Sequence, residues 1–244
     1  MKLSTIEYIG AKPRKKKKRK GLLAVLLLAL LIGAGVFSVM NLGIGESLAK
    51  DVAPSKKLTI EQLESTVLSD DTFANNLAKA GLYRTKKDVS YDPAYYNIEY
   101  PMGDLPSNKG ICTDVIIRAY REVGVDLQEL IHEDMGKSFD SYPNTWGLEK
   151  RDSNIDHRRV PNIQHFLTRN GKSLIISENS GDYNYGDIVV WKLSHGEPHI
   201  GIVVPSPLEN DSMPWIVHNV GNGPKWENRL FDYKITGHFR FKAH

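Results

Sequence analysis

Residues 187–204 read DIVVWKLSHGEPHIGIVV, two short runs rich in β-branched residues. Gly196 and Pro198 lie between the runs and are typical of a turn. Similar runs follow later in the chain, and clusters of Gly and Pro separate them too. This pattern predicts four strands that form an antiparallel meander. The predicted strands are 187–191, 199–204, 215–220 and 235–241.

Helix signals precede these strands. The clearest helix begins near Cys112, because apolar residues recur there at the i, i+3, i+4 and i+7 spacing and Gly124 provides a stop. A capping box at residues 59–62 predicts another helix start. Helices followed by strands indicate an α+β domain. Further helices are expected from Asp71 or Thr72 to Gly81, over 126–135 and over 161–169, with a loop over 91–106.

The N-terminus has the charge pattern of a membrane anchor. Residues 1–20 contain a dense block of Lys and Arg, and residues 21–40 are uncharged and rich in aliphatic side chains. Twenty residues at helical rise reach about 30 Å, the hydrocarbon thickness of a bilayer. The positive-inside rule keeps the basic segment cytoplasmic. We expect a single-pass membrane protein whose remaining residues lie outside, with secretion after cleavage near Ala49 as the alternative.

The exported part differs in charge from the whole chain. Residues 1–20 hold nine basic side chains and one acid, a net charge of +8, whereas the whole chain has +3. The other residues therefore carry −5, which removes the electrostatic basis for nucleic-acid binding. Residues 41–58 contain Gly, Pro and Ser without periodicity and are typical of a linker. Residues 59–244 are then expected to form one domain with a sizeable core.

Cys112 is the only cysteine of the 244 residues, so no disulfide can form within the chain. In an exported protein, such a thiol is buried, paired between chains or used. A helix N-terminus favours a thiolate, and the backbone N–H of Cys112 is placed to stabilise an oxyanion. Cys112 is therefore a candidate nucleophile, and a buried packing residue is the alternative.

Histidine is the usual base for a cysteine nucleophile. His199 opens one predicted strand and His218 lies inside the next, so neighbouring strands would bring the two imidazoles to one side. Adjacent residues of a strand point to opposite faces, so His218 and Asn219 cannot both face the thiol. We expect His199 to act as the base and His218 to orient it, with Asn219 as the alternative orienting group.

These segments resemble papain-like cysteine peptidases of the NlpC and CHAP types. The resemblance rests on Gly-Ile-Cys-Thr-Asp at a helix start and on Tyr-Gly-Asp-Ile-Val, His-Ile-Gly-Ile-Val and Ile-Val-His in the strands. The strings at 103–106, 112–121, 132–135 and 154–159 resemble, more narrowly, a bacterial domain-of-unknown-function family (number 1287) within that superfamily. Two features depart from the pattern, namely Ile111 before the cysteine and the long segment 125–186.

The resemblance implies a papain-like domain whose cysteine helix packs on the antiparallel sheet. It also implies that Cys112 cleaves an amide or peptide bond through an acyl-enzyme, with His199 as base and His218 as orienter. The resemblance also implies a cell-wall substrate, namely the stem peptide or the sugar–peptide amide of peptidoglycan. Two alternatives remain: a non-catalytic wall-binding or scaffold module on the same fold, and an acyltransferase or lipid deacylase with the same triad.

Three further residues are candidates for substrate binding. Arg158 or Arg159 would receive a substrate carboxylate through paired hydrogen bonds, and the alternative is a solvated loop with salt bridges. Tyr95 is a candidate to line the cleft, and packing is its alternative.

Two patterns that suggest other chemistry have simpler interpretations. Asp187 follows Gly186 at a strand start, which favours hydrogen bonding within the turn over a place in a triad. His195 and His199 have a spacing seen in zinc sites, but Gly196 and Pro198 prevent the helix that would align them. We therefore expect neither a metal nor a cofactor.

Overall fold

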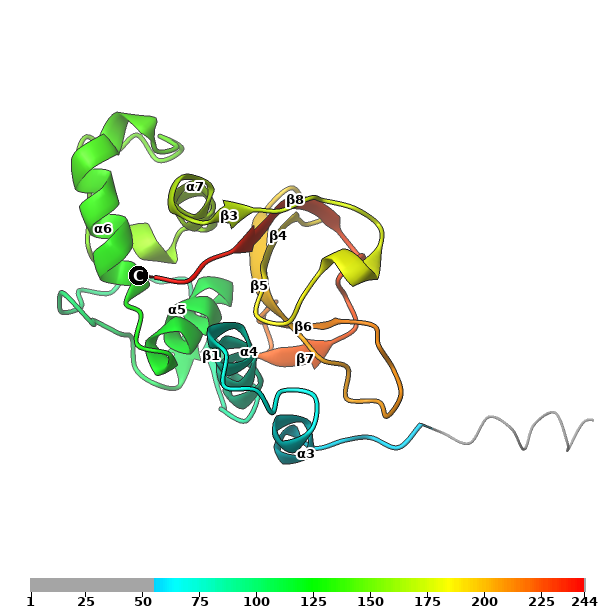
Figure 1. Cartoon of the computed structure of the whole chain (residues 1–244). Coiled ribbons are helices and arrows are strands. Elements are labelled where there is room, and N and C mark those ends of the chain that lie inside the picture. Colours follow the sequence, from blue (N-terminus) through cyan, green and yellow to red (C-terminus); the bar gives the residue numbers. More distant parts are fainter. Residues whose placement is uncertain (1–54, 244) are drawn as a thin grey trace, which may run out of the picture. The chain divides into compact units, whose positions relative to one another are not determined.

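The computed structural model describes residues 55–243, which form a mixed helix and sheet unit (Figure 1). The predicted cytoplasmic segment 1–20, the anchor 21–40 and most of the linker 41–58 lie outside the described residues. Among residues 55–243, no helix is long and apolar enough to cross a membrane.

The predicted helices are all present, with shifted ends. The capping box is confirmed, because the Thr59 hydroxyl accepts a 3.3 Å hydrogen bond from the N–H of Gln62 and the Gln62 side chain accepts one of 2.9 Å in return. Gly81 does not end its helix as predicted. It lies inside the helix, where a Cβ would come within 3.2 Å of Ile202, so close packing on the sheet explains it. The helices are α3 (Ile60–Ser65), α4 (Phe73–Arg84), α5 (Cys112–Glu122), α6 (Leu127–Ser138) and α7 (Val160–Asn170).

Three single turns of 3-10 helix, η1 (Phe139–Ser141), η2 (Asp156–Arg158) and η3 (Ser180–Asp182), interrupt the long segment 125–186 within the described residues. A short parallel pair, β1 (Ser90–Tyr91) and β2 (Lys109–Gly110), brackets the predicted loop 91–106. The pairing of β1 with β2 brings Tyr91 opposite Gly110, two residues before Cys112.

The main sheet is antiparallel throughout and has the strand order β3-β8-β4-β5-β6-β7. The four predicted strands correspond to β4, β5, β6 and β8. The meander prediction was only partly correct. Strands β4, β5 and β6 are neighbours in chain order, but β8 pairs with β4 on the side of β4 away from β5. The strands are β3 (Lys172–Ser173), β4 (Ile188–Lys192), β5 (Pro198–Val204), β6 (Trp215–His218), β7 (Lys225–Glu227) and β8 (Lys234–Arg240).

The two faces of the sheet carry different clusters of buried residues. Figure 1 shows the helices gathered to one side of the sheet, and α4, α5 and α7 contact β5. Ile200 and Ile202 point into this larger helix-side cluster, which also includes Cys112. Alternate residues such as Trp191 and Val203 form a smaller cluster. Strand periodicity therefore assigns the side chains of β5 to two environments.

Candidate active site

His199 and His218 lie side by side on neighbouring strands, as the strand pattern predicted. His199 Nε2 is 3.0 Å from His218 Nδ1, and both side chains are buried. The register pairs His199 with Trp191 across β4 and β5, and the ring centroids of these two residues are 6.0 Å apart. The imidazole pair therefore belongs to the sheet face of Trp191 and is excluded from water.

Glu227 completes the pair and was missed in the sequence. It lies at the end of β7, and its Oε2 is 3.0 Å from His218 Nε2. The same oxygen is 3.3 Å from Nε of Arg229. The three-residue strand β7 is too short to show a period in the sequence, so no local signal distinguished this acid from other surface acids.

The contacts determine which ring nitrogens carry protons. Burial and the neighbouring charge of His218 lower the pKa of His199 to about 3. Burial also lowers the pKa of His218, although the hydrogen bond to Glu227 opposes this shift. Both rings are therefore neutral at pH 7, and each carries one N–H. A carboxylate only accepts, so His218 donates from Nε2 to Glu227 and accepts at Nδ1 from His199 Nε2. His199 Nδ1 is then left with its lone pair.

Cys112 is the first residue of α5, as predicted, and its side chain is only 4% exposed. It packs in the helix-side cluster close to the backbone of Ile200, the residue after His199. Within residues 55–243, the thiol makes no hydrogen bond to His199 or His218. Cys112 thus lies against the strand that carries His199, but on the helix side of the sheet, whereas the imidazole pair lies on the face of Trp191.

The thiol is not pre-ionised, contrary to the prediction from the helix N-terminus. Burial raises the pKa of Cys112 to about 12, against a smaller opposite effect of the Ile200 backbone N–H. Desolvation outweighs the helix dipole here because the side chain is enclosed by apolar neighbours and the nearby imidazoles are neutral.

Tyr91 lies close enough to Cys112 for a charge on the cysteine to affect the pKa of the tyrosine. Burial raises the pKa of Tyr91, and the negative charges of Cys112 and Asp114 add to the shift. Its side chain is nevertheless 41% exposed, so the ring borders both the solvent and the cysteine. Tyr91 is therefore a candidate wall of any path from solvent to Cys112.

Asn219 faces the other way from His218, as strand parity requires. Its Nδ2 donates a 3.3 Å hydrogen bond to the carbonyl of Gly110, and its Oδ1 accepts one of 3.1 Å from the N–H of Gly221. The residue is 1% exposed. Asn219 therefore joins the end of β6 to the segment before Cys112, and the orienting contact to His199 is made by His218.

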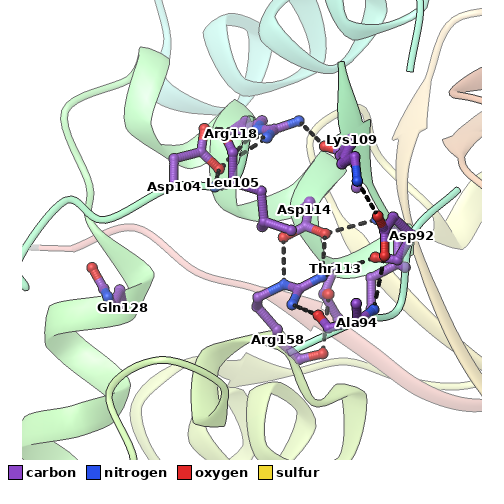
Figure 2. Close-up of polar contacts among 12 residues, drawn as sticks. Asp92, Ala94, Asp104, Leu105, Lys109, Thr113, Asp114, Arg118, Gln128 and Arg158 are labelled. Atoms are coloured by element: carbon purple, nitrogen blue, oxygen red, sulfur yellow. Dashed lines mark hydrogen bonds and ion pairs between the residues drawn. The ribbon is translucent and has the colours of Figure 1, made fainter. Parts of the chain in front are cut away.

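A buried ion pair holds the start of α5 in place (Figure 2). Asp114 accepts a 2.7 Å hydrogen bond from the N–H of Ile111, which caps the helix in place of a polar N-cap side chain. The same carboxylate receives Nε and Nη2 of Arg158 at 3.0 and 3.2 Å. The hydroxyl of Thr113 donates to the carbonyl of Arg158 at 3.1 Å. These bonds tie the cysteine turn to η2.

Arg158 is therefore not placed to receive a substrate carboxylate, which corrects one of the two arginine predictions. Its side chain is fully buried in the ion pair with Asp114. The remaining nitrogen, Nη1, donates to the carbonyl of Ala94 at 3.0 Å. Arg159 is different, because its guanidinium lies 4.2 Å from the ring centroid of Trp146 and keeps a 15% exposed side chain.

Tyr95 stands on the surface, with 57% of it exposed. Its hydroxyl donates to Asp152 Oδ2 at 3.1 Å and accepts from Asn154 Nδ2 at 2.9 Å. These bonds join the loop after β1 to the loop before η2. The role of Tyr95 in substrate binding stays a prediction.

Asp187 forms bonds that the sequence did not suggest. Its Oδ2 accepts from the N–H of Asn184 at 2.9 Å, which is the predicted turn bond. The carboxylate also contacts His238 Nε2 at 3.0 Å and Arg240 Nε at 2.7 Å. In the described part of the chain, no group of three or more His, Cys, Asp or Glu side chains has the arrangement of a metal site.

The sequence of this chain is similar to those of known proteins. Residues 78–241 match the model of a domain of unknown function, DUF1287. The chain is 49% identical over 151 residues to "Uncharacterized protein YijF" of Escherichia coli (strain K12), a match that covers 62% of this chain and 73% of the relative. Among solved structures, it is similar to NlpC1 from Trichomonas vaginalis with a TM-score of 0.39 and 16% identity. That match covers 72% of this chain and 47% of the other, so the chain spans about half the length of that protein.

Proposed function

The chain belongs to the DUF1287 family, and from the cysteine and the histidine pair of this domain we propose that it is a cysteine hydrolase of papain-like, NlpC/CHAP type. It cleaves an amide or peptide bond with Cys112 as nucleophile, His199 as base and His218 as the residue that orients the base. Glu227 joins this group as a positioning residue.

The observation that carries the proposal is the ordered row of nitrogens from His199 to Glu227. His199 Nε2 and His218 Nδ1 are 3.0 Å apart, and so are His218 Nε2 and Glu227 Oε2. Apolar side chains would fill this space without needing hydrogen bonds, whereas buried imidazoles destabilise the fold unless they are paired. Packing alone therefore does not explain two imidazoles whose tautomers are set by a carboxylate. A base does require it, since its lone pair must be held on one defined nitrogen.

For acylation, the thiol and the His199 ring must come together, since Cys112 packs on the helix side of the sheet and the imidazoles lie on the face of Trp191. The Cys112 sulfur attacks the carbonyl carbon, the S–C bond forms, and the thiol proton passes to Nδ1 of His199. Because the thiol has a raised pKa, the proton leaves during the attack and not before it. The backbone N–H groups at the start of α5 face the developing oxyanion. The C–N bond then breaks, and His199 gives the proton to the leaving amine.

Deacylation returns the chain to its starting state. His199, again neutral, takes a proton from water as the water oxygen attacks the thioester carbon. The S–C bond breaks, His199 returns its proton to the Cys112 sulfur, and the product leaves as a carboxylate after its carboxyl group releases the second water proton to solvent. The long segment between α5 and β4 is proposed to select the substrate.

The substrate proposed is peptidoglycan, at an amide of its peptide part. The uncharged segment 21–40 after a basic block supports a position outside the cell membrane, where this polymer lies. The net negative charge of residues 21–244 supports a substrate other than nucleic acid.

One observation favours a second candidate, a non-catalytic module on the same fold. The thiol of Cys112 is 4% exposed and has no hydrogen bond to either imidazole in the described residues. Catalytic contacts often tighten only when substrate binds, and the proposed hydrolase requires such a change between the thiol and His199.

The deciding experiment compares the full-length chain with its Cys112→Ala variant on purified peptidoglycan. Fragments released by the unaltered chain and not by the variant, identified by mass spectrometry, would support the hydrolase and name the bond. Equal release by both proteins, with the variant folded as judged by circular dichroism, would refute the mechanism. Release by neither would favour the non-catalytic module.

A further inference from the structure

A recess of about 140 Å³ lies between α6, the turn after it and the start of α7. A cavity of roughly 150 Å³ accommodates a benzene ring, so this one holds an apolar side chain of modest size. Its wall is mainly apolar and aromatic, and four polar residues, Asp140, Asn144, Arg159 and Asn162, complete it. It shares no lining residue with the histidine pair. The apolar wall is formed by Met135, Phe139, Tyr142 and Trp146.

Asn162 lines this recess and carries an unsatisfied acceptor. The residue is only 2% exposed, and its Nδ2 donates a 3.1 Å hydrogen bond to the carbonyl of Asp156. Because a carbonyl only accepts, this bond fixes the orientation of the amide and turns Oδ1 away from Asp156. Oδ1 is buried and has no partner among the described residues. A buried acceptor left alone is destabilising by about 1–3 kcal/mol, so a donor from a ligand would complete it.

Arg159 presents a cation at the same recess. Its Nη1 is bound to Asp156 Oδ1 at 3.2 Å, and its guanidinium lies over the ring of Trp146, 4.2 Å from the centroid. These two contacts hold the planar group in position, and it makes no other hydrogen bond within residues 55–243. A positioned guanidinium fork with unused N–H donors suits a carboxylate.

The recess is connected to the cysteine turn. The Thr113 hydroxyl donates to the carbonyl of Arg158 at 3.1 Å. Cys112 precedes one of these residues and Arg159 follows the other, so each is one Cα–Cα step of about 3.8 Å from a bonded pair. The wall of the recess and the cysteine turn are therefore joined through the bond between Thr113 and Arg158.

We propose that this recess binds the C-terminal end of a short peptide. The terminal carboxylate pairs with Arg159, the N–H of the last residue donates to Asn162 Oδ1, and the last side chain packs against the apolar wall. That this peptide is the substrate rests on the proposed function. The recess would then make the chain selective for peptides with a free carboxyl end over peptides linked at that end.

The test measures binding in the full-length Cys112→Ala variant, which cannot consume the ligand. The probe is N-acetyl-alanyl-alanine, with the last residue in the L or the D form, compared with its C-terminal amide by isothermal calorimetry. One form of the acid is expected to bind at least tenfold more tightly than its amide, because hydrogen bonds to charged groups contribute about 1.5–3 kcal/mol. Equal affinities of acid and amide, or no binding of either, would overturn the proposal.

Two further variants locate the binding. Arg159→Gln, added to Cys112→Ala, is expected to weaken binding of the acid roughly 10- to 100-fold and to leave the amide unchanged. Asp140→Asn is the matched control, because Asp140 is an exposed carboxylate that lines the same recess as Arg159. It is expected to bind the acid at least as well. Full binding by the Arg159 variant, or loss in the Asp140 variant alone, would refute the assignment.

Binding by the recess and hydrolysis of peptidoglycan can fail independently of each other. Acid-selective binding without hydrolysis of peptidoglycan by the unaltered chain would support the recess and refute the hydrolase. Hydrolysis with equal binding of acid and amide would do the reverse.

Discussion

The carboxylate of Glu227 lies 3.0 Å from Nε2 of His218, although the acid is 38% exposed and the imidazole only 2%. A surface charge thus reaches the end of a buried row of nitrogens. Because a carboxylate accepts and never donates when ionised, this contact determines the tautomer of His218 and, through it, that of His199.

Replacing Glu227 should therefore reduce catalysis without displacing the nucleophile. We expect Glu227→Ala to lower kcat/KM for peptidoglycan fragments roughly 10- to 100-fold, the equivalent of one hydrogen bond to a charged group. Glu227→Gln should lose less, because its amide oxygen can still accept from His218. Since Glu227 raises the pKa of His218, the acid side of the pH–rate profile should also move in both variants.

A matched control for Glu227 is Asp232→Asn. Asp232 bonds Arg229 at 3.0 Å, in the same loop, and has no bond to either imidazole in the described residues. It should keep nearly full activity, and its pH profile should move less than that of the Glu227 variants, because Asp232 raises the pKa of His218 less than Glu227 does. Equal losses at Asp232 and Glu227 would show that loop charge, and not the tautomer, matters.

His218 and Asn219 should fail in different ways. His218→Ala is expected to remove most activity, by roughly the 10²- to 10⁴-fold that a positioned acid–base group supplies, beyond the loss of about 1–3 kcal/mol in unfolding free energy that the unpaired N–H of His199 causes. Asn219→Ala leaves the Gly110 carbonyl without its donor and should lower the free energy of unfolding by about 1–3 kcal/mol. Thermal melts and rates measured on both variants check this. A larger activity loss at Asn219, with stability unchanged, would show that Asn219 and not His218 orients the base.

Strand periodicity explains why the histidine pair could be predicted. The side-chain period of two determined that His199 and His218 share a face once β5 and β6 were neighbours, and short connections make consecutive antiparallel strands neighbours. The helical spacing of apolar residues identified the helix start at Cys112 in a similar way. The position of β8 could not be predicted in this way, because its pairing with β4 depends on contacts about 50 residues apart in sequence.

The residues that sequence reasoning missed act through distant contacts. Glu227 lies on a three-residue strand, and Tyr91 reaches the cysteine through a two-residue parallel pair, both too short to show a period. The raised pKa of Cys112 was unforeseen for a related reason. A helix N-terminus is a local feature, whereas the burial that outweighs it depends on the sheet packed against the helix.

The ion pair between Asp114 and Arg158 should be a point of high sensitivity. Asp114→Ala leaves a buried guanidinium unpaired and removes the bond to the N–H of Ile111. Removing one partner of a buried pair typically lowers the free energy of unfolding by 3–5 kcal/mol, so urea denaturation should show a loss of about that size. Asp114→Asn should lose less, since its oxygen can still accept.

The comparison for this loss is Glu61→Ala, which breaks a surface contact with Lys86 whose side chains are 59% and 45% exposed. Exposed pairs contribute little, so no measurable change is expected. Similar losses at Asp114 and Glu61 would mean that the buried pair does not support the fold.

Acid should destabilise the domain before most carboxylates titrate. Burial lowers the pKa of both His199 and His157 to about 3, with nearby positive charges adding to each shift. An unfolded histidine titrates near 6.5, so between these values the unfolded chain binds protons that the native chain does not. Stability is therefore complete above pH 6.5 and falls as the pH drops, by up to about 1.4 kcal/mol per pH unit for each histidine.

The variant that tests this pH dependence is His157→Phe, since His157 is 2% exposed and its Nδ1 has no partner within residues 55–243. The slope of unfolding free energy against pH between about 4.5 and 6.5 should fall by one histidine's share. An unchanged slope would show that His157 already carries a proton in the native state.

The thiol of Cys112 should resist labelling while the chain is folded. With a pKa of about 12, only about one thiol in 10⁵ is ionised at pH 7, against a few per cent for an ordinary cysteine. We expect iodoacetamide to react at least a thousandfold more slowly with the folded chain than with the urea-unfolded chain, and the rate to rise tenfold per pH unit. Rapid labelling at pH 7 would mean that the native thiol is exposed or ionised, unlike the buried group at the start of α5. Slow labelling together with hydrolysis of peptidoglycan would show that His199 removes the proton only inside the substrate complex, because no other state of the thiol is nucleophilic enough.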